Sequence, residues 1–439
     1  MAELELIAAR PWSAHPSAAP RTETDGRGAY RTAANGSRTC YGGWQFEYAV
    51  EPGRWYEVAI SARPEGVDLP RDVLVCEAIW CPMATDEIRV LFHESRYLLP
   101  KPDGAGGIRF RLRQQAPAGE AVLTLRCAFR WTTSGEAVWS LPKVEEVDAP
   151  AARTSRVRIA VVTGSEPSRP RSMPSVQANL DYYGSRLEAA CERWQPELAV
   201  LPEIAVQYGV AGRRLDLAVP APGPETEVFS EIARRHRVRV VLGMYEREGD
   251  AAYNSAVLIA PDGSIDGRYH KVHLAPGGET ESGLCPGDSF PVYETEVGRI
   301  GCNICMDSSA VESSRMVGLA GAEILALPIM GDHRADRWTI GPDIFNESRW
   351  LAIQRTRALD NQLCMVIARN TARGSCVISR KGDVLAWNEG DVDSIFAEVD
   401  LDGGYRIFDG DDFVDVNWMQ RRPHLYGLFV DPDCYGSLR

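Results

Sequence analysis

The pattern of apolar residues changes near residue 150, and this change most constrains the fold. Before it lie short segments rich in valine, tyrosine, tryptophan and phenylalanine, separated by turn-forming pairs such as Pro52-Gly53 and Ser134-Gly135. The apolar residues of this region show no spacing typical of a helix. Many short strands at regular spacing are typical of an all-β sandwich. We therefore predict a β-sandwich domain of jelly-roll type over residues 1–150.

After a connector rich in proline and alanine at 148–156, predicted strands and helices alternate. Apolar residues between Val176 and Trp194 recur at steps of three and four, which predicts an amphipathic helix. Further helices are expected near 225–237, at 309–321 and at 349–362. Predicted hairpins interrupt the alternation, so the sequence indicates an α/β domain with mixed sheets over residues 156–439, including a C-terminal tail.

Length, charge and cysteine usage limit the classes of protein to which this chain can belong. A chain of 439 residues fits two or three domains. A net charge of −13 disfavours nonspecific binding to nucleic acid or anionic membranes. The sequence has no apolar run long enough for a signal peptide or a membrane span, and its eleven cysteines follow no regular framework. We expect a reduced, cytoplasmic protein.

Three short stretches carry residues capable of chemistry. Glu203 ends the apolar segment "ELAVLPE", and Lys271 lies in "GRYHKVHLAPGGE", which ends at Glu279. Cys305 ends the apolar segment "GRIGCNIC". The ends of strands are where α/β folds place their sites. Because a thiol reacts as the thiolate, Cys305 needs a base and a positive charge, for which Glu203 and Lys271 are candidates. Spacing alone does not show that the three residues meet.

Cys302 and Cys305 form a CxxC pair that invites a metal or redox interpretation. If one strand runs through both, side chains three apart point to opposite faces. The sequence offers no tight turn between them, and no second CxxC or suitably spaced histidine pair completes a zinc site. We therefore expect no metal and no cofactor, with Cys302 as a buried apolar residue and Cys305 as the nucleophile.

The three stretches, in this order, resemble the nitrilase superfamily of carbon–nitrogen hydrolases over residues 156–390. Supporting segments are "YNSAVLIAPDG" (253–263) and "RTRALDNQLCMVIARN" (355–370). The resemblance implies a four-layer αββα sandwich, a homo-oligomer and a Glu203–Lys271–Cys305 triad, with Glu279 as a fourth member. It also implies cleavage of a small linear amide or carbamoyl compound through a cysteine thioester.

The sequence departs from the superfamily pattern at the residues after the nucleophile. Cys305 is followed by Met306 and Asp307 rather than the Cys-Trp-Glu of true nitrilases, which favours the amidase and carbamoyl-amide branches. Nitrile hydrolysis stays the alternative. Residues 310–312 lack the usual aromatic-Pro-Glu step. The long, charged segment 330–350 is either a substrate-specificity loop or a solvated insertion.

The remaining candidate residues surround the proposed nucleophile. The resemblance implies that Lys271 and the backbone N–H of Met306 stabilise the oxyanion. Tyr208 and Met330 are further candidates for substrate binding. His270 and His273 flank Lys271 and leave a cysteine–histidine dyad open as an alternative. If 269–274 is strand-like, both histidines point away from Lys271.

The first 148 residues weakly resemble galactose-binding-like jelly rolls of carbohydrate-binding modules. Trp44, Trp80, Trp131 and Trp139 either stack on a sugar or belong to the core. A glycan-targeted amidohydrolase is therefore an alternative, and a lid or an oligomer contact is the other role open to this domain. The C-terminal stretch "QRRPHLYGLFVDPDCYGSLR" either crosses to a partner subunit or packs on its own chain.

Overall fold

The computed structural model describes residues 4–81, 94–119, 122–150, 155–164, 175–331, 345–401 and 419–431. The chain divides into two compact units. The first comprises residues 1–153 and 404–439, and the second comprises residues 154–403. Most of the segment expected to set specificity, 332–344, lies outside the described residues. Within the described part, no helix is long and apolar enough to cross a membrane.

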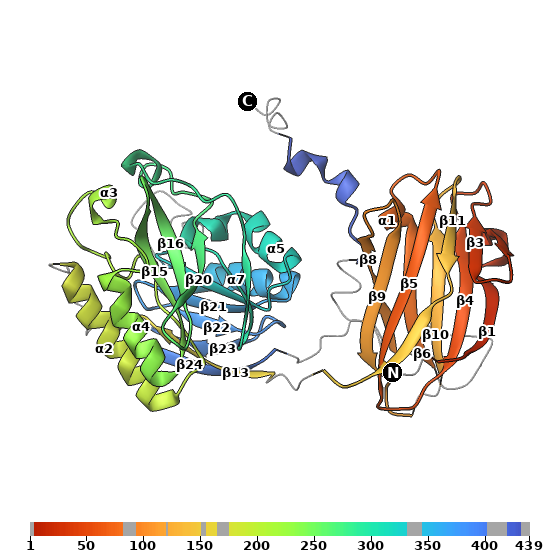
Figure 1. The fold of residues 1–439 in the computed structure, drawn as a ribbon. Helices are drawn as coiled ribbons and strands as arrows, with labels where there is room; N and C mark the ends of the chain where they lie inside the picture. The colour runs from red at the N-terminus through yellow and green to blue at the C-terminus, as the bar shows by residue number, and fades with distance from the viewer. Residues whose placement is uncertain are drawn as a thin grey trace. The chain divides into compact units, whose positions relative to one another are not determined.

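The first unit contains two sheets in which every strand pair is antiparallel. The five-stranded sheet has the order β1 (Leu6–Ser13), β4 (Tyr41–Ala49), β10 (Val122–Arg130), β6 (Leu74–Cys81), β7 (Glu94–Tyr97). The seven-stranded sheet has the order β2 (Arg21–Thr24), β3 (Ala29–Ala33), β11 (Glu136–Ser140), β5 (Trp55–Glu65), β9 (Ile108–Gln115), β8 (Leu99–Pro102), with β12 (Lys143–Val147) on β5. Figure 1 shows these strands in red to yellow, with the short helix α1 (Pro70–Val73) beside them.

A single hydrophobic core lies between these two sheets. Phe46 and Leu125 contribute from the five-stranded sheet, and Ile60 and Phe110 from the other. The predicted β-sandwich is therefore present, whereas its jelly-roll type stays a prediction. Three of the four tryptophans considered for sugar stacking belong to this core, with exposed fractions of 5% or less: Trp44, Trp80 and Trp139.

The described part of the C-terminal tail contacts the first unit. It forms two short 3₁₀ turns, Pro423–Leu425 and Gly427–Phe429. His424 Nδ1 lies 2.8 Å from Asp72 Oδ2, and the Arg422 guanidinium lies 4.4 Å from the ring centre of Trp131. The tail was expected to belong with the α/β domain. In the structure its described residues group with the β-sandwich instead, because these polar and aromatic contacts hold it there.

The second unit contains two six-stranded mixed sheets. One has the order β17 (Ile265–His270), β16 (Ala251–Ile259), β15 (Arg239–Glu248), β14 (Leu198–Val200), β13 (Arg156–Val162), β24 (Ser394–Asp400). The other has the order β18 (Val292–Thr295), β19 (Gly298–Cys302), β20 (Ile324–Ile329), β21 (Cys364–Arg369), β22 (Cys376–Ile378), β23 (Val384–Trp387). The central strands of each sheet are parallel and the outer ones antiparallel, as predicted from the intruding hairpins.

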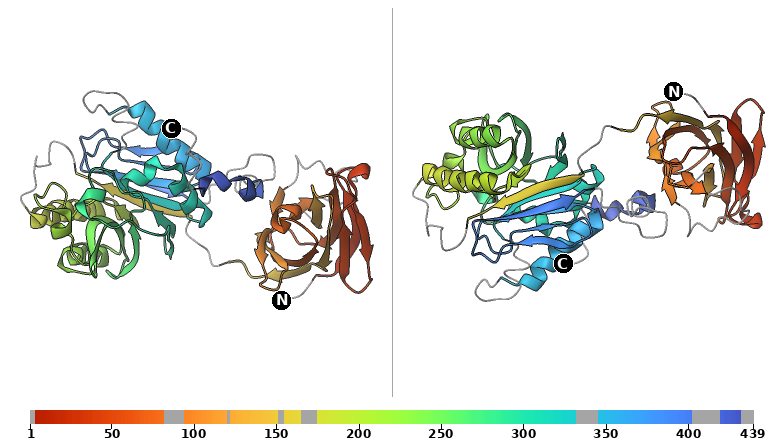
Figure 2. Two further views of the ribbon diagram at one scale, coloured as in Figure 1. Left: turned by 90° about the horizontal axis from the view of Figure 1, so that it is seen from above. Right: turned by 90° about the horizontal axis from the view of Figure 1, so that it is seen from below.

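Three apolar clusters define four layers in this unit. One cluster joins the inner faces of the two sheets. A second packs α2 (Val176–Trp194) and α4 (Pro224–His236) onto the first sheet, and a third packs α5 (Val311–Leu319) and α7 (Glu347–Asn361) onto the other. Figures 1 and 2 show the two sheets between these helical layers. The expected αββα arrangement is observed, and its helices lie close to the predicted positions.

The strands that lead to Glu203 and Cys305 end earlier than expected. β14 ends at Val200 rather than continuing to Glu203, and β19 ends at Cys302 rather than running through Cys305. The condition of one strand through both cysteines is therefore not met, because Cys305 begins a 3₁₀ turn, Cys305–Ser309, with a positive φ of 44°. The sequence patterns also did not predict α3 (Arg214–Leu217), β18 and β24.

Candidate active site

Glu203 lies on a buried turn after β14. The following residue, Ile204, has a positive φ of 47°, so the chain reverses directly after Glu203. One carboxylate oxygen of Glu203 accepts a hydrogen bond of 2.9 Å from the backbone N–H of Met330. The Asn370 amide donates to the Glu203 carbonyl oxygen at 2.7 Å. Residues directly after β20 and β21 therefore fix the carboxylate and the backbone of Glu203.

Lys271 follows the end of β17 and is only 1% exposed. Its Nζ atom lies 2.9 Å from Glu203 Oε1 and 2.8 Å from Glu279 Oε2. Burial favours the neutral amine, but the negative charges of the two carboxylates prevail and hold the pKa of Lys271 above its ordinary value. The same ammonium, against the opposing effect of burial, lowers the pKa of Glu279. Lys271 is thus a fixed cation between two carboxylates.

Asn254, on β16, joins the two carboxylates from the other side. Its Nδ2 atom donates to Glu203 Oε1 at 2.7 Å and to Glu279 Oε1 at 2.6 Å. Glu279 also accepts a hydrogen bond of 2.7 Å from the backbone N–H of Ala275. Each carboxylate therefore has several donors, which is what buried charge requires.

Cys305 lies at the start of the 3₁₀ turn after β19 and is partly exposed. Its Sγ atom lies 3.6 Å from the carbonyl oxygen of Gly331, the neighbour of the Met330 residue that binds Glu203. Burial and the charge of Glu203 raise the pKa of Cys305 to about 12, although Lys271 and two backbone groups act in the opposite direction. At neutral pH the thiol is therefore protonated, and a base has to take its proton during the reaction.

Cys302 differs from Cys305 in its surroundings. It ends β19, is 1% exposed and belongs to the apolar cluster between the two sheets. Both cysteines are free thiols, and the described residues include no group of three or more histidine, cysteine or carboxylate side chains able to hold a metal ion. The surroundings of Cys302 thus match the expectation of a buried apolar residue.

The two histidines beside Lys271 have carboxylate partners of their own. His270 stacks on Tyr253, with ring centres 3.9 Å apart, and lies 3.2 Å from the buried Glu246. His273 Nδ1 lies 2.8 Å from Asp307 Oδ1. Among the described residues, no hydrogen bond joins Cys305 to either histidine, and the geometry therefore favours a lysine–glutamate arrangement over a cysteine–histidine dyad.

The three candidate substrate-binding residues lie in different positions. Met306 is the second residue of the 3₁₀ turn, and no hydrogen bond to its backbone N–H is found in the described parts of the chain. Met330 is 43% exposed and contacts Glu203 through its backbone. Tyr208 is partly exposed and packs against the apolar cluster around Ile204. These placements keep all three as candidates.

Sequence reasoning missed three buried residues that organise the site: Asn254, Asp307 and Asn370. Each belongs to a segment that resembles the superfamily, and this is the signal that could have identified them. No pattern in the sequence shows that a single amide bridges two carboxylates, because that contact depends on how β16 pairs with its neighbours.

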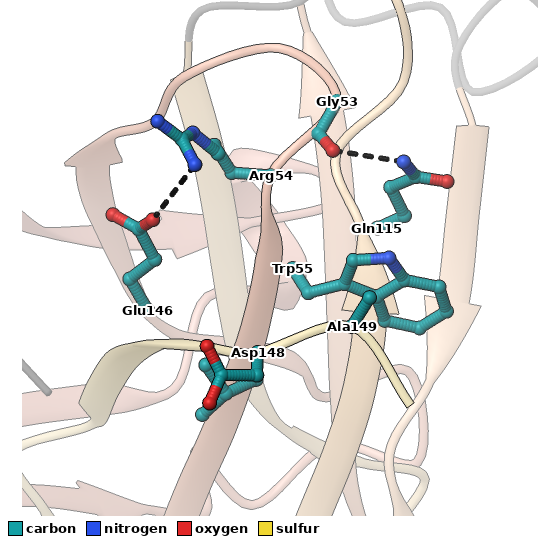
Figure 3. A pocket seen from close by; sticks show the side chains of 8 residues that line it. Gly53, Arg54, Trp55, Gln115, Glu146, Asp148 and Ala149 are labelled. Carbon is teal, nitrogen blue, oxygen red and sulfur yellow. Dashed lines mark hydrogen bonds and ion pairs between the residues drawn. The ribbon is translucent and has the colours of Figure 1, made fainter. Parts of the chain in front are cut away.

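A separate pocket of about 540 Å³ lies in the first unit, and Figure 3 shows its lining residues. Trp55 contributes an indole ring, and polar side chains surround it. Arg54 lies 3.7 Å from Glu146, and Gln115 donates to the Gly53 carbonyl at 2.8 Å. The pocket therefore combines an aromatic surface with hydrogen-bonding groups, and Trp55 was not among the tryptophans considered for sugar stacking.

Comparison with protein families defines the class of the second unit. The carbon-nitrogen hydrolase family matches residues 158–406, more than half of the chain. The chain belongs to this family. Its matched region contains Glu203, Lys271 and Cys305.

Individual relatives agree with this assignment. The chloroplastic omega-amidase of Arabidopsis thaliana is 30% identical over 245 residues, which cover 51% of this chain and 63% of that protein. Omega-amidase NIT2 of Xenopus tropicalis is 31% identical over 206 residues, covering 43% of this chain and 70% of the relative.

Solved structures share the fold. A carbon-nitrogen hydrolase from Helicobacter pylori matches with a TM-score of 0.51 and 21% identity, covering 63% of this chain and 99% of its own. The NitFhit protein of C. elegans matches with a TM-score of 0.51 and 25% identity, covering 63% of this chain and 67% of its own. These matches show the fold of the second unit.

Proposed function

We propose that the second unit is a thiol-dependent hydrolase that cleaves a small linear amide or carbamoyl compound. The observation that carries this proposal is the buried Lys271 ammonium, 2.9 Å from Glu203 and 2.8 Å from Glu279. Adjacent residues, Met330 and Gly331, bind Glu203 and Cys305 respectively. A base, a cation and a nucleophile thus share one site.

In the proposed reaction, Glu203 takes the proton of the Cys305 thiol as the sulfur attacks the amide carbonyl carbon. The carbonyl π electrons move to oxygen, and Lys271 stabilises the oxyanion together with the backbone N–H of Met306. When the carbonyl reforms, the carbon–nitrogen bond breaks and Glu203 returns the proton to the leaving nitrogen. Ammonia or an amine departs, and a thioester remains on Cys305.

Hydrolysis of the thioester completes the proposed cycle. Glu203 takes a proton from water while the water oxygen attacks the thioester carbonyl. The carbon–sulfur bond then breaks, the proton passes to sulfur and the acid leaves. Glu279 contributes by holding Lys271, since it accepts from Nζ at 2.8 Å.

The substrate class is tested by measuring ammonia release from a panel of linear amides, carbamoyl compounds and nitriles. Because relatives are named omega-amidases, amides at the end of a linear chain are the first compounds to test. We expect turnover of amides or carbamoyl compounds that is lost in Cys305→Ala and retained in Cys302→Ala. Turnover of nitriles alone would favour the alternative, nitrile hydrolysis.

We propose sugar binding by the first unit as a second candidate function, supported by the Trp55 pocket. Aromatic rings beside polar groups suit ligands that have one apolar face and many hydroxyls. Calorimetry of the full chain with a panel of mono- and oligosaccharides should detect binding that Trp55→Ala abolishes. Binding of no sugar, or equal binding by the variant, would leave the unit as a lid or an oligomer contact.

Two further expectations belong to this proposal. Family members pair through the sandwich, so we propose a homo-oligomer. Light scattering at several concentrations measures its molar mass. The nine cysteines whose side chains the structure describes are all free, which supports a reducing compartment such as the cytoplasm.

A further inference from the structure

The carboxylate of Asp307, two residues after Cys305, collects hydrogen bonds from two different turns. The side chain is fully buried, with an exposed fraction of 0%. Its Oδ2 atom accepts from the Tyr269 hydroxyl at 2.7 Å and from the backbone N–H of Ile304 at 2.9 Å. Its Oδ1 atom accepts from the backbone N–H of His273 at 2.9 Å and lies 2.8 Å from His273 Nδ1.

These contacts connect the segment that carries Lys271 with the turn that carries Cys305. Tyr269 and His273 lie two residues before and two residues after Lys271. Ile304 directly precedes Cys305. The two turns come from different sheets, since β17 and β19 belong to separate sheets of the sandwich. Asp307 is therefore a direct link between the position of the cation and the position of the nucleophile.

The Cys305 turn needs such a link because its backbone is strained. Cys305 has a φ of 44°, a region that residues with a Cβ seldom adopt. The Asp307 side chain binds the N–H of Ile304, and the Asp307 N–H binds the Ile304 carbonyl at 3.0 Å. Asp307 thus binds both the N–H and the carbonyl group of Ile304, the residue that directly precedes Cys305.

We propose that Asp307 is a positioning residue that fixes the Cys305 turn against the Lys271 segment, so that the oxyanion forms where Lys271 can stabilise it. This inference rests on the proposed amide hydrolysis. Asp307 touches no reacting atom in this account and transfers no proton. Catalysis depends steeply on such placement, since a shift of about 1 Å can cost about 10²-fold in rate.

The test compares Asp307→Asn with Tyr269→Phe and with the double variant. Asn keeps the shape of Asp307, but its NH₂ group cannot accept the hydrogen bonds that one carboxylate oxygen accepts. We expect Asp307→Asn to lower kcat about 10²-fold with little change in KM, and Tyr269→Phe to lower it less. If both act through one link, the double variant loses no more than Asp307→Asn alone.

A matched control and a second readout separate positioning from loss of folding. Tyr293→Phe removes a hydroxyl that bonds the Arg268 backbone at 2.6 Å and should leave kcat unchanged. Rates are normalised to the folded protein that size-exclusion chromatography recovers, so misfolded molecules do not count. A normal kcat per folded molecule in Asp307→Asn, or fully additive losses in the double variant, would overturn the proposal.

The rate of Cys305 alkylation distinguishes failure of this inference from failure of the proposed function. If the wild-type protein releases ammonia from no amide, the proposed function fails, but the alkylation rates of wild type and variants still compare the nucleophile's placement. We expect Asp307→Asn to alkylate Cys305 about tenfold more slowly, because the thiol leaves the field of Lys271. Equal alkylation rates at Cys305 would contradict the inference whatever the substrate.

Discussion

Lys271 occupies the least replaceable position in the site. Its ammonium lies between the buried carboxylates Glu203 and Glu279, whose side chains are 3% and 6% exposed. A buried ion pair contributes little net stability as a whole, but removing one partner leaves the other charge without compensation. At this scale, catalysis and stability depend on the same ammonium.

Replacement of Lys271 should therefore affect both properties. In Lys271→Met the stem remains and the charge is lost. We expect turnover to fall by about 10²–10³-fold and the free energy of unfolding to fall by about 3–5 kcal/mol. Ammonia release and thermal unfolding measure the two effects. Lys381→Met, at an exposed lysine, is the control and should change neither. An unchanged melting temperature in Lys271→Met would contradict the ion-pair account.

At the scale of elements, sheet pairing delivers the catalytic groups. β15 passes directly beneath the Glu203 turn, and Gly243 allows this approach. A Cβ atom at position 243 would overlap the carbonyl oxygen of Pro202 and lie 2.9 Å from the Glu203 Cα atom. The absence of a side chain at position 243 therefore helps to set the height of the Glu203 carboxylate above the sheet.

Gly243→Ala should displace the Glu203 turn. We expect a loss of about 1–3 kcal/mol in stability from overpacking and a loss of kcat larger than the loss of folded protein. Gly184→Ala, in helix α2, is a matched control, because its Cβ would meet Val228 and Ile232 at 3.5 and 3.7 Å. The control should be neutral or slightly stabilising. Equal activity of Gly243→Ala and Gly184→Ala would contradict this role for β15.

The segment after β17 should also give stability a pH dependence. The hydrogen bond and the charge of Asp307 hold the pKa of His273 above its ordinary value, and Glu312 adds to the effect. Folded His273 thus binds its proton more tightly than unfolded His273. The resulting stability is fully present below about pH 6.5 and is lost as the pH rises through the higher, folded pKa.

His273→Gln removes this dependence. We expect the difference in melting temperature between wild type and His273→Gln to shrink as the pH rises from about 6 to about 8.5. Thermal unfolding at matched ionic strength measures it. A difference that grows over this range would have the wrong sign and would contradict the assignment.

Sequence patterns predicted regular elements better than the turns that carry the chemistry. The helix expected from Val176 to Trp194 has these bounds in the structure, because its apolar stripe packs on one sheet. The turns at Glu203 and Cys305 were expected as strand, because buried turns with a positive φ leave no period in the sequence. The role of Asn254 depends on strand register, which alternation of apolar residues does not determine.

At the scale of the whole molecule, the two units have separate cores and separate candidate sites. The β-sandwich has its own apolar cluster, and the four clusters described in the second unit contain no residue of the first unit. The described tail residues bind the first unit through Trp131 and Asp72. The sequence predicts a boundary near residue 150, whereas no pattern in the tail indicates its partner.

Loss of the Trp131 ring should release the tail without affecting the catalytic unit. In Trp131→Ala we expect trypsin to cut after Arg421 several-fold faster, since the stacked Arg422 that follows it loses its partner. Trp12→Ala is the control, because Trp12 stacks with Arg126 at 4.2 Å elsewhere on the same unit. Mass spectrometry follows the cleavage rates. Faster cleavage in Trp131→Ala than in Trp12→Ala, together with unchanged ammonia release, would agree with this account. Equal cleavage in both variants would contradict it.

The central claim is that Cys305, and not Cys302, is the nucleophile of an amide hydrolase. The most direct measurement is mass mapping of the adduct formed by 2-chloroacetamide, an amide with an electrophilic carbon, on the native protein. We predict a single adduct on Cys305 that is lost in Cys305→Ala, persists in Cys302→Ala and parallels the loss of ammonia release. An adduct on Cys302, or amide turnover that survives Cys305→Ala, would contradict the account.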